Sequence, residues 1–178
     1  MDRTLIFLLD RSGSMETCRD DTIGGFNAFV SDQKTLGGKL TLVQFDHEIK
    51  NVFEDTPLGD VAPLTFETFQ PRGSTALLDA VGQTIKAHAA KEGVIFIIQT
   101  DGEENCSSKY TKAHIKDLVE QKTKEGWTFM YLGASQDAFA EAGSMGIAPA
   151  ATLHYDVRRT PEAFSQLSAA VSQQASNN

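Results

Sequence analysis

The chain has few of the features that mark membrane-spanning, disulfide-bonded or nucleic-acid-binding proteins. Its 178 residues include only two cysteines and one tryptophan. No apolar run approaches the roughly 18 residues that suggest a transmembrane helix. Lys and Arg number 16 against 24 Asp and Glu, for a net charge of −8. The chain therefore has no excess of Lys and Arg with which to neutralise the phosphates of a nucleic acid. We expect no membrane span and no nucleic-acid partner.

The two cysteines, Cys18 and Cys106, are too few for a disulfide framework. Each follows a polar loop described below, so they either share one face of the molecule or are two unrelated thiols. The sequence opens with Met1-Asp2-Arg3 and a short apolar run. A cleaved signal peptide would remove that run, so we expect none. The prediction is a cytoplasmic protein that keeps both thiols reduced.

Short apolar runs alternate with helical patterns along the chain, which is typical of a sheet with helices on both faces. Strands are expected at 4–9, 39–45, 48–53, 94–99, 128–132 and 152–155, and helices around 23–30, at 75–90 and 111–124, around 139–142 and from 160. The strand at 48–53 should be antiparallel, because the turn before it is too short for a crossover. The pattern predicts an α/β, Rossmann-like, doubly wound fold. Its six-stranded sheet is mostly parallel, with one antiparallel edge strand.

Several residues predict where helices begin, pack and end. Ser135 is expected to cap the short helix around 139–142, and Thr160, followed by Pro161, to begin the last helix. The pair Gly24-Gly25 inside the first helix suggests that another backbone packs closely there. We expect one domain, residues 1–171, followed by a frayed polar tail, residues 172–178.

The most informative segment is the end of the first apolar run. Leu9 is followed by Asp10, and Ser12 and Ser14 come at the next alternate positions, with Gly13 easing the turn. Three oxygen-bearing side chains at this spacing can converge on one point. Oxygen ligands suit a small hard cation, with Mg²⁺ the first choice.

Two further loops offer oxygens at the same edge of the expected sheet. Thr75 opens the helix at 75–90, and Asp101 directly follows the buried strand at 94–99. In an open parallel sheet, ligands bind outside the carboxyl ends of the strands. We therefore predict that Asp10, Ser12, Ser14, Thr75 and Asp101 face a single metal site.

These three segments resemble the metal-ion-dependent adhesion site (MIDAS) of von Willebrand factor A (VWA) domains. The resemblance rests on Asp10-x-Ser12-x-Ser14, on Thr75 in Gly73-Ser74-Thr75 and on Asp101 in Thr100-Asp101-Gly102. It covers nearly the whole chain and is closest to short, single-domain intracellular versions from bacteria and phages. It implies that Ser12, Ser14 and Thr75 are metal ligands, and that Asp10 and Asp101 bind directly or through water.

The resemblance also implies a function. In such domains the bound ion, Mg²⁺ with Mn²⁺ or Ca²⁺ as alternatives, takes a carboxylate from a partner's Asp or Glu. The chain is therefore expected to be a metal-dependent protein-interaction module and not an enzyme. An AAA-type ATPase or a multiprotein assembly is the partner class that intracellular relatives suggest.

Two enzyme classes are alternatives to a protein-interaction module. An aspartate-nucleophile phosphohydrolase would attack phosphoryl groups with Asp10 and Mg²⁺, and it resembles haloacid-dehalogenase-type enzymes. Those enzymes need a second acid two residues after the nucleophile, where this chain has Ser12. A serine hydrolase is disfavoured because the Gly-x-Ser-x-Gly elbow is missing and the four histidines are scattered.

Other polar residues lie near the expected site. His47 either lines its rim or is a solvated turn residue, whereas His88 and His114 are expected at the surface or boundary of helices. Asp79, Glu103 and Glu104 are expected to form a solvated acidic rim.

Overall fold

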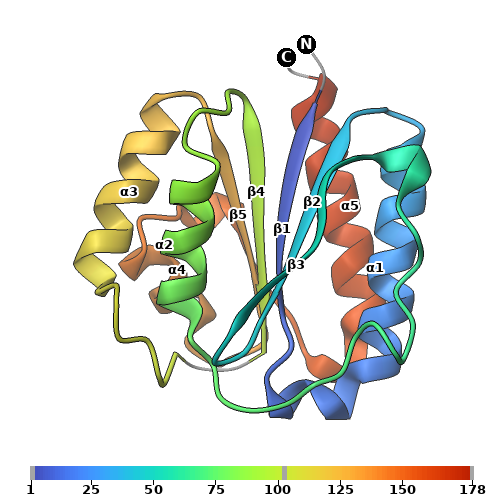
Figure 1. Ribbon diagram of the computed structural model, residues 1–178, viewed down its shortest axis with the longest axis horizontal. Coiled ribbons are helices and arrows are strands. Elements are labelled where there is room, and N and C mark those ends of the chain that lie inside the picture. Colours follow the sequence, from blue (N-terminus) through green and yellow to red (C-terminus); the bar gives the residue numbers. More distant parts are fainter. Residues whose placement is uncertain (1–2, 102–103, 177–178) are drawn as a thin grey trace.

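A six-stranded sheet separates two layers of helices (Figure 1). The structure is a computed structural model and describes residues 3–101 and 104–176. The strands are β1 (Thr4–Asp10), β2 (Lys39–Phe45), β3 (Ile49–Pro57), β4 (Val94–Thr100), β5 (Thr128–Gly133) and β6 (Thr152–His154). Their order in the sheet is β3-β2-β1-β4-β5-β6, and only the β2–β3 pair is antiparallel. The predicted fold class, including the antiparallel edge strand, is confirmed.

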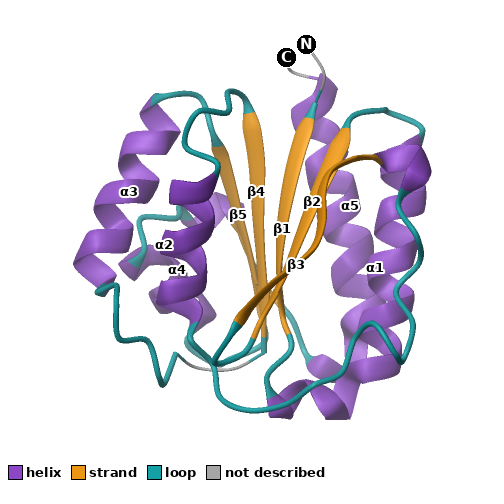
Figure 2. Cartoon of the chain, viewed as in Figure 1, coloured by secondary structure: helices purple, strands orange, loops and turns teal. Residues whose placement is uncertain are grey.

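Helices cover both faces of the sheet (Figure 2). They are α1 (Arg19–Lys34), α2 (Leu77–Ala87), α3 (Lys112–Lys124), α4 (Ala138–Ser144) and α5 (Thr160–Ser176). Helices α1 and α5 pack on one face, and α2, α3 and α4 pack on the other. Within residues 3–101 and 104–176, no helix combines the length and the apolar character that a membrane span requires.

The central strands are apolar on both faces because each face meets a separate core. In β1, Leu5, Phe7 and Leu9 pack in the core beneath α1 and α5. Ile6 and Leu8 point the other way, into the core beneath α2 and α3. This two-sided burial explains why the strand reads as a continuous apolar run. Polar side chains are therefore accommodated at the end of β1, where the strand leaves the two cores.

Some predicted helix ends differ from the structure. A 3₁₀ helix, Gly13–Cys18, precedes α1, so helical structure begins well before residue 23. Asp137, not Ser135, is the N-cap of α4; the Ser135 hydroxyl accepts from the Asp137 amide, in the turn before the helix, and donates to Glu141 Oε1. Thr160 is itself the first residue of α5, and its hydroxyl donates to the carbonyl of Val157.

The C-terminal helix is longer than we expected. Helix α5 continues through Ser176, so the prediction that the chain frays from residue 172 is wrong up to that point. The Ser172 hydroxyl accepts a hydrogen bond from Gln33 Nε2, which ties this turn to α1.

The close packing predicted at Gly24-Gly25 is present at Gly25, but the neighbour is a side chain and not a backbone. A Cβ at Gly25 would lie 2.4 Å from the ring of Phe164.

Candidate metal centre

Three loops meet at the carboxyl edge of the sheet, at the bottom of Figure 2. The first follows β1, the second leads into α2, and the third follows β4. Because β1 and β4 are parallel neighbours, their last residues leave the sheet side by side. The parallel topology therefore brings Asp10 and Asp101 to the same edge, as predicted from the strand ends.

Hydrogen bonds join four of the five predicted site residues. The Ser12 amide donates to Asp10 Oδ1 at 2.6 Å, and the Ser12 and Ser14 hydroxyl oxygens lie 3.2 Å apart. The Ser14 hydroxyl donates to Asp101 Oδ1 at 2.9 Å. The remaining oxygen of Asp10 accepts a hydrogen bond from the Thr100 hydroxyl at 2.7 Å. The result is a continuous chain of hydrogen bonds from Asp10 through Ser12 and Ser14 to Asp101.

Thr75 reaches this cluster through main-chain contacts. The Gly13 amide donates to the Gly73 carbonyl at 3.0 Å, which places the two loops against each other. Asn105 holds Thr75 itself, accepting from its amide at 2.9 Å and donating to its carbonyl at 3.0 Å. Among the five site residues, all of them described, Thr75 is the one whose hydroxyl forms no hydrogen bond with the others.

The site is open to solvent on one side. Asp10 is fully buried, and Ser12 and Thr75 are nearly so. Ser14 is exposed and Asp101 is half-buried. A ligand approaching from solvent would therefore meet the Ser14–Asp101 side of the cluster first.

The two carboxylates of the site carry unbalanced negative charge. Burial raises the pKa of Asp101 to about 6, and the nearby charge of Asp10 adds to this effect. Burial also raises the pKa of Asp10, against the opposing hydrogen bonds from Thr100 and Ser12. In the described part of the chain, no lysine, arginine or histidine pairs with either carboxylate. Buried charges are costly without a partner of opposite charge, so a bound cation would stabilise this arrangement.

The spacing of the oxygens fits a small ion. In an octahedral Mg²⁺ site with Mg–O distances of about 2.1 Å, adjacent ligand oxygens lie about 3.0 Å apart. The two side-chain oxygen separations along the cluster, 3.2 Å between Ser12 and Ser14 and 2.9 Å between Ser14 and Asp101, are close to that value. These residues can therefore act as neighbouring ligands with little rearrangement.

The expected acidic rim is wrong for Asp79. Its side chain is nearly buried and accepts hydrogen bonds from the amides of Ser108, Lys109 and Tyr110, each at 2.9 Å. It therefore organises the loop before α3 and does not face solvent. Glu104 is half-buried and accepts from the Ser107 amide at 2.9 Å. Glu103 lies outside the described residues.

The histidines and cysteines have distinct environments. His88 is buried, contrary to expectation, and its ring nitrogens lie 2.8 Å from the Thr84 carbonyl and from Glu54 Oε1. The exposed ring of His47 packs on Gly73, where a Cβ would lie only 2.3 Å from Nδ1, so His47 does border the loop of Thr75. Cys18 is buried in the 3₁₀ helix, whereas Cys106 is exposed; both are free thiols.

Comparison with known proteins supports the fold. No family model matches the sequence, and a search of curated proteins gives no match. The vWF domain of the type V pili tip protein Mfa5 from Porphyromonas gingivalis matches with a TM-score of 0.74 at 11% identity. That match covers 96% of this chain and 95% of the other.

Two of the similar structures contain metal. Proximal thread matrix protein 1 from the mussel byssus, with a zinc-occupied MIDAS motif, has a TM-score of 0.68 at 16% identity. The match covers 94% of this chain and 47% of that protein, so this chain spans about half its length. A manganese-loaded TRAP protein from Plasmodium vivax has a TM-score of 0.61 at 15% identity, covering 91% and 71%. The chain therefore has the fold of von Willebrand factor A domains.

Proposed function

We propose that this chain is a metal-dependent protein-interaction module. Asp10, Ser12, Ser14, Thr75 and Asp101 would hold a divalent cation, Mg²⁺ in the first place and Mn²⁺ or Ca²⁺ as alternatives. A carboxylate from an Asp or Glu of a partner protein would complete the site. The supporting observation is that the buried carboxylate of Asp10 and the half-buried carboxylate of Asp101 share a cluster in which the described residues include no cationic partner.

The donor set suits binding of an anionic group. Three of the five proposed ligands are neutral hydroxyls, so the protein cancels only part of the charge of a divalent ion. When bound, such an ion supplies an open coordination position for an anionic oxygen. Ser14 is exposed and Asp101 half-buried, which leaves room on their side of the cluster for a partner's carboxylate. The buried Asp10 and Ser12 would instead fix the ion from below.

The same residues are poorly arranged for catalysis, and we propose that the site performs none. Asp10 is fully buried, so a phosphoryl group approaching from solvent would meet Ser14 and Asp101 before it could reach the Asp10 carboxylate. Ser12 replaces the acid that a phosphohydrolase would need. Within residues 3–101 and 104–176, no histidine bonds to Ser12 or Ser14 to activate either hydroxyl.

The partner and its setting are inferred from the VWA fold. We propose a cytoplasmic protein, of bacterial or phage origin, whose partner is an AAA-type ATPase or a subunit of a multiprotein assembly. The net charge of −8 disfavours a nucleic-acid partner.

Metal titration tests the first half of the proposal. Isothermal titration calorimetry with Mn²⁺ should give one site in the wild type, and Thr75→Ala should weaken binding at least 10-fold. Ser74→Ala is the matched control, because Ser74 is the exposed neighbour of Thr75 in the same loop. Equal Mn²⁺ binding by all three proteins would mean that the predicted residues do not form the site.

The second half is tested with peptides selected from a random library on the Mg²⁺-loaded protein. Peptides that lose binding in EDTA should each depend on one Asp or Glu. Replacing that residue with its amide should abolish binding. Selected peptides that bind equally well in EDTA, and equally well to the Ser12→Ala variant, would show that metal does not mediate recognition.

A further inference from the structure

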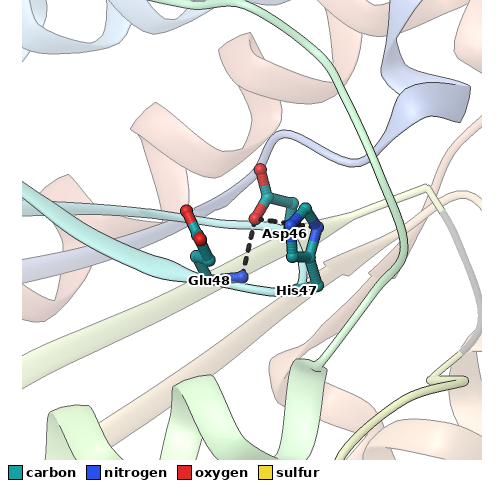
Figure 3. A group of neighbouring side chains, drawn as sticks. All are labelled: Asp46, His47 and Glu48. Carbon is teal, nitrogen blue, oxygen red and sulfur yellow. Dashed lines mark hydrogen bonds and ion pairs between the residues drawn. The ribbon is translucent and has the colours of Figure 1, made fainter.

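A second group of metal-ligating side chains lies beside the candidate centre. Asp46, His47 and Glu48 form the turn between β2 and β3, and their ligand atoms lie within 4.8 Å of one another (Figure 3). Both oxygens of Asp46 are already engaged, however. Oδ1 accepts from the Glu48 amide at 2.7 Å, and Oδ2 accepts from two arginines. The group is therefore organised around ion pairs.

The two arginines come from two of the three loops that carry the proposed metal ligands, the loop of Ser12 and the loop of Thr75. Arg11 Nε and Arg72 Nε each lie 2.9 Å from Asp46 Oδ2. Arg11 stands between Asp10 and Ser12, and Arg72 precedes Thr75 by three residues. We call these three side chains, Arg11, Asp46 and Arg72, the Asp46 hub.

Main-chain hydrogen bonds also join the three segments that carry the hub side chains. The Arg11 amide donates to the Phe45 carbonyl at 2.8 Å, and the Arg72 amide donates to the Arg11 carbonyl at 2.7 Å. The Ala76 amide donates to the Asp46 carbonyl at 2.8 Å. The segment from Arg72 to Ala76, with Thr75 inside it, is thus fastened at both ends. One end is tied to the loop of Ser12, and the other to Asp46.

Burial restricts the Arg11–Asp46 pair of the hub. Asp46 is fully buried and the side chain of Arg11 is only 10% exposed, whereas the side chain of Arg72 is 50% exposed. A buried carboxylate between two guanidinium groups has few alternative arrangements, because a displaced partner would leave an uncompensated charge. The hub also keeps the guanidinium of Arg11 paired with Asp46, although Arg11 is the chain neighbour of Asp10.

We propose that Arg11, Asp46 and Arg72 are positioning residues that set the separation between the Ser12–Ser14 loop and the Thr75 loop. That separation decides whether the hydroxyls of both loops reach the same ion. The inference rests on the proposed metal site, and it explains how Thr75, which is not hydrogen-bonded to the other site residues, is held in place. Residues that orient metal ligands typically change metal affinity 10- to 100-fold when they are replaced.

The test compares Arg72 with Lys50. Both side chains line the same surface cavity, of about 440 Å³, but in the described part of the chain Lys50 forms no ion pair with Asp46. Removing either cation makes the protein more negative, which on electrostatic grounds alone should strengthen Mn²⁺ binding. Positioning by Arg72 predicts the opposite sign. Arg72→Met should weaken Mn²⁺ binding about 10-fold, whereas Lys50→Met should leave it unchanged or slightly stronger.

A conservative variant separates geometry from charge. Arg72→Lys keeps the positive charge but loses the planar guanidinium that approaches Asp46 through Nε. It should weaken Mn²⁺ binding by several-fold, between the wild type and Arg72→Met. Wild-type affinity in both Arg72 variants would overturn the proposal.

Amide hydrogen exchange gives a readout that does not need metal. In EDTA, the Gly13 and Ala76 amides should exchange faster in Arg72→Met than in the wild type, and at the wild-type rate in Lys50→Met. If the wild type binds no Mn²⁺ but this exchange pattern appears, the proposed metal site is wrong while the hub still positions the loops. Unchanged exchange in Arg72→Met would show that the hub does not hold them.

Discussion

Two buried aspartates end neighbouring strands at the same edge of the sheet, and their surroundings are opposite. Asp10 ends β1, and Asp46 directly follows β2; both are fully buried. Asp46 meets two guanidinium groups at 2.9 Å. Asp10 instead accepts hydrogen bonds from neutral groups, including the amide of Ser12 and the hydroxyl of Thr100, and burial raises its pKa.

The difference separates two roles for a buried carboxylate. Asp46 has its counter-charges built into the chain, so it can hold loops together permanently. Asp10 has none within the described residues, and its nearest charged neighbour in the cluster is another acid, Asp101. A buried charge without a partner is costly, so such an arrangement is typical of a site that takes its counter-charge from outside.

The largest expected effect comes from breaking the Asp46 hub. Asp46→Asn should lower the free energy of unfolding by about 3 kcal/mol, because it leaves the buried Arg11 without a counter-charge. Urea unfolding in EDTA measures this difference. Glu48→Gln is the control, since the Glu48 side chain is 62% exposed and exposed pairs contribute at most about 1 kcal/mol. A loss below 1 kcal/mol in Asp46→Asn would remove the distinction between the two aspartates.

The equivalent change at Asp10 should spare the fold and remove the metal. Asp10→Asn takes away a buried charge that has no cationic partner, and the amide can still bond to Ser12 and Thr100. We expect the free energy of unfolding in EDTA to stay within about 1 kcal/mol of the wild type. Mn²⁺ affinity should fall by about 100-fold or more, as measured by calorimetry. Strong destabilisation of the metal-free protein by this variant would indicate that Asp10 is structural, like Asp46.

Sequence patterns single out one of these aspartates and give no signal for the role of the other. Asp10 follows an apolar run and precedes two hydroxyls at alternate positions, so its signal is local. Asp46 also follows an apolar run, but its partners Arg11 and Arg72 lie 35 and 26 residues away. Nothing in the turn Asp46-His47-Glu48 indicates those contacts. The sequence therefore predicts only a short connection at this turn.

The other errors have the same cause. Asp79 bonds to amides about 30 residues along the chain, and His88 to Glu54 across 34 residues. Periodicity predicted the mostly parallel sheet, its antiparallel edge strand and the edge at which the candidate residues meet, because those depend on the apolar pattern and the lengths of connections. Whether a polar side chain faces water or a distant partner depends on the assembled fold. The assignment of the five oxygens as metal ligands itself remains a prediction.

A smaller effect should appear in the pH dependence of the metal-free protein. The pKa of Asp101 is raised from 3.8 to about 6 in the folded state, mainly by burial. A raised pKa means that the folded state favours the protonated carboxyl. The stability contributed by this group is therefore full below pH 3.8 and is lost as the pH rises through about 6.

The measurement is urea unfolding in EDTA at pH 4 and pH 7, in the wild type and in Asp101→Asn. Other carboxylates titrate in both proteins, so only the difference between them is informative. Relative to the wild type, Asp101→Asn should be more stable at pH 7 than at pH 4. An equal difference at both values would mean that Asp101 titrates normally and that the site does not concentrate negative charge.

The smallest expected effect is the absence of turnover. A generic aryl phosphate or carboxylic ester should not be hydrolysed faster in the presence of Mg²⁺ and this protein than with Mg²⁺ alone. Asp10 is fully buried, and Ser12, the residue two positions on, has a hydroxyl that cannot readily serve as general acid and base. Asp10→Asn is the decisive control, because contaminating phosphatases would survive it. Activity that disappears in Asp10→Asn but persists in Lys50→Met would assign turnover to the site of Asp10 and would overturn the proposal of a non-catalytic interaction module. The contrast with Asp46 would then separate a catalytic aspartate from a structural one.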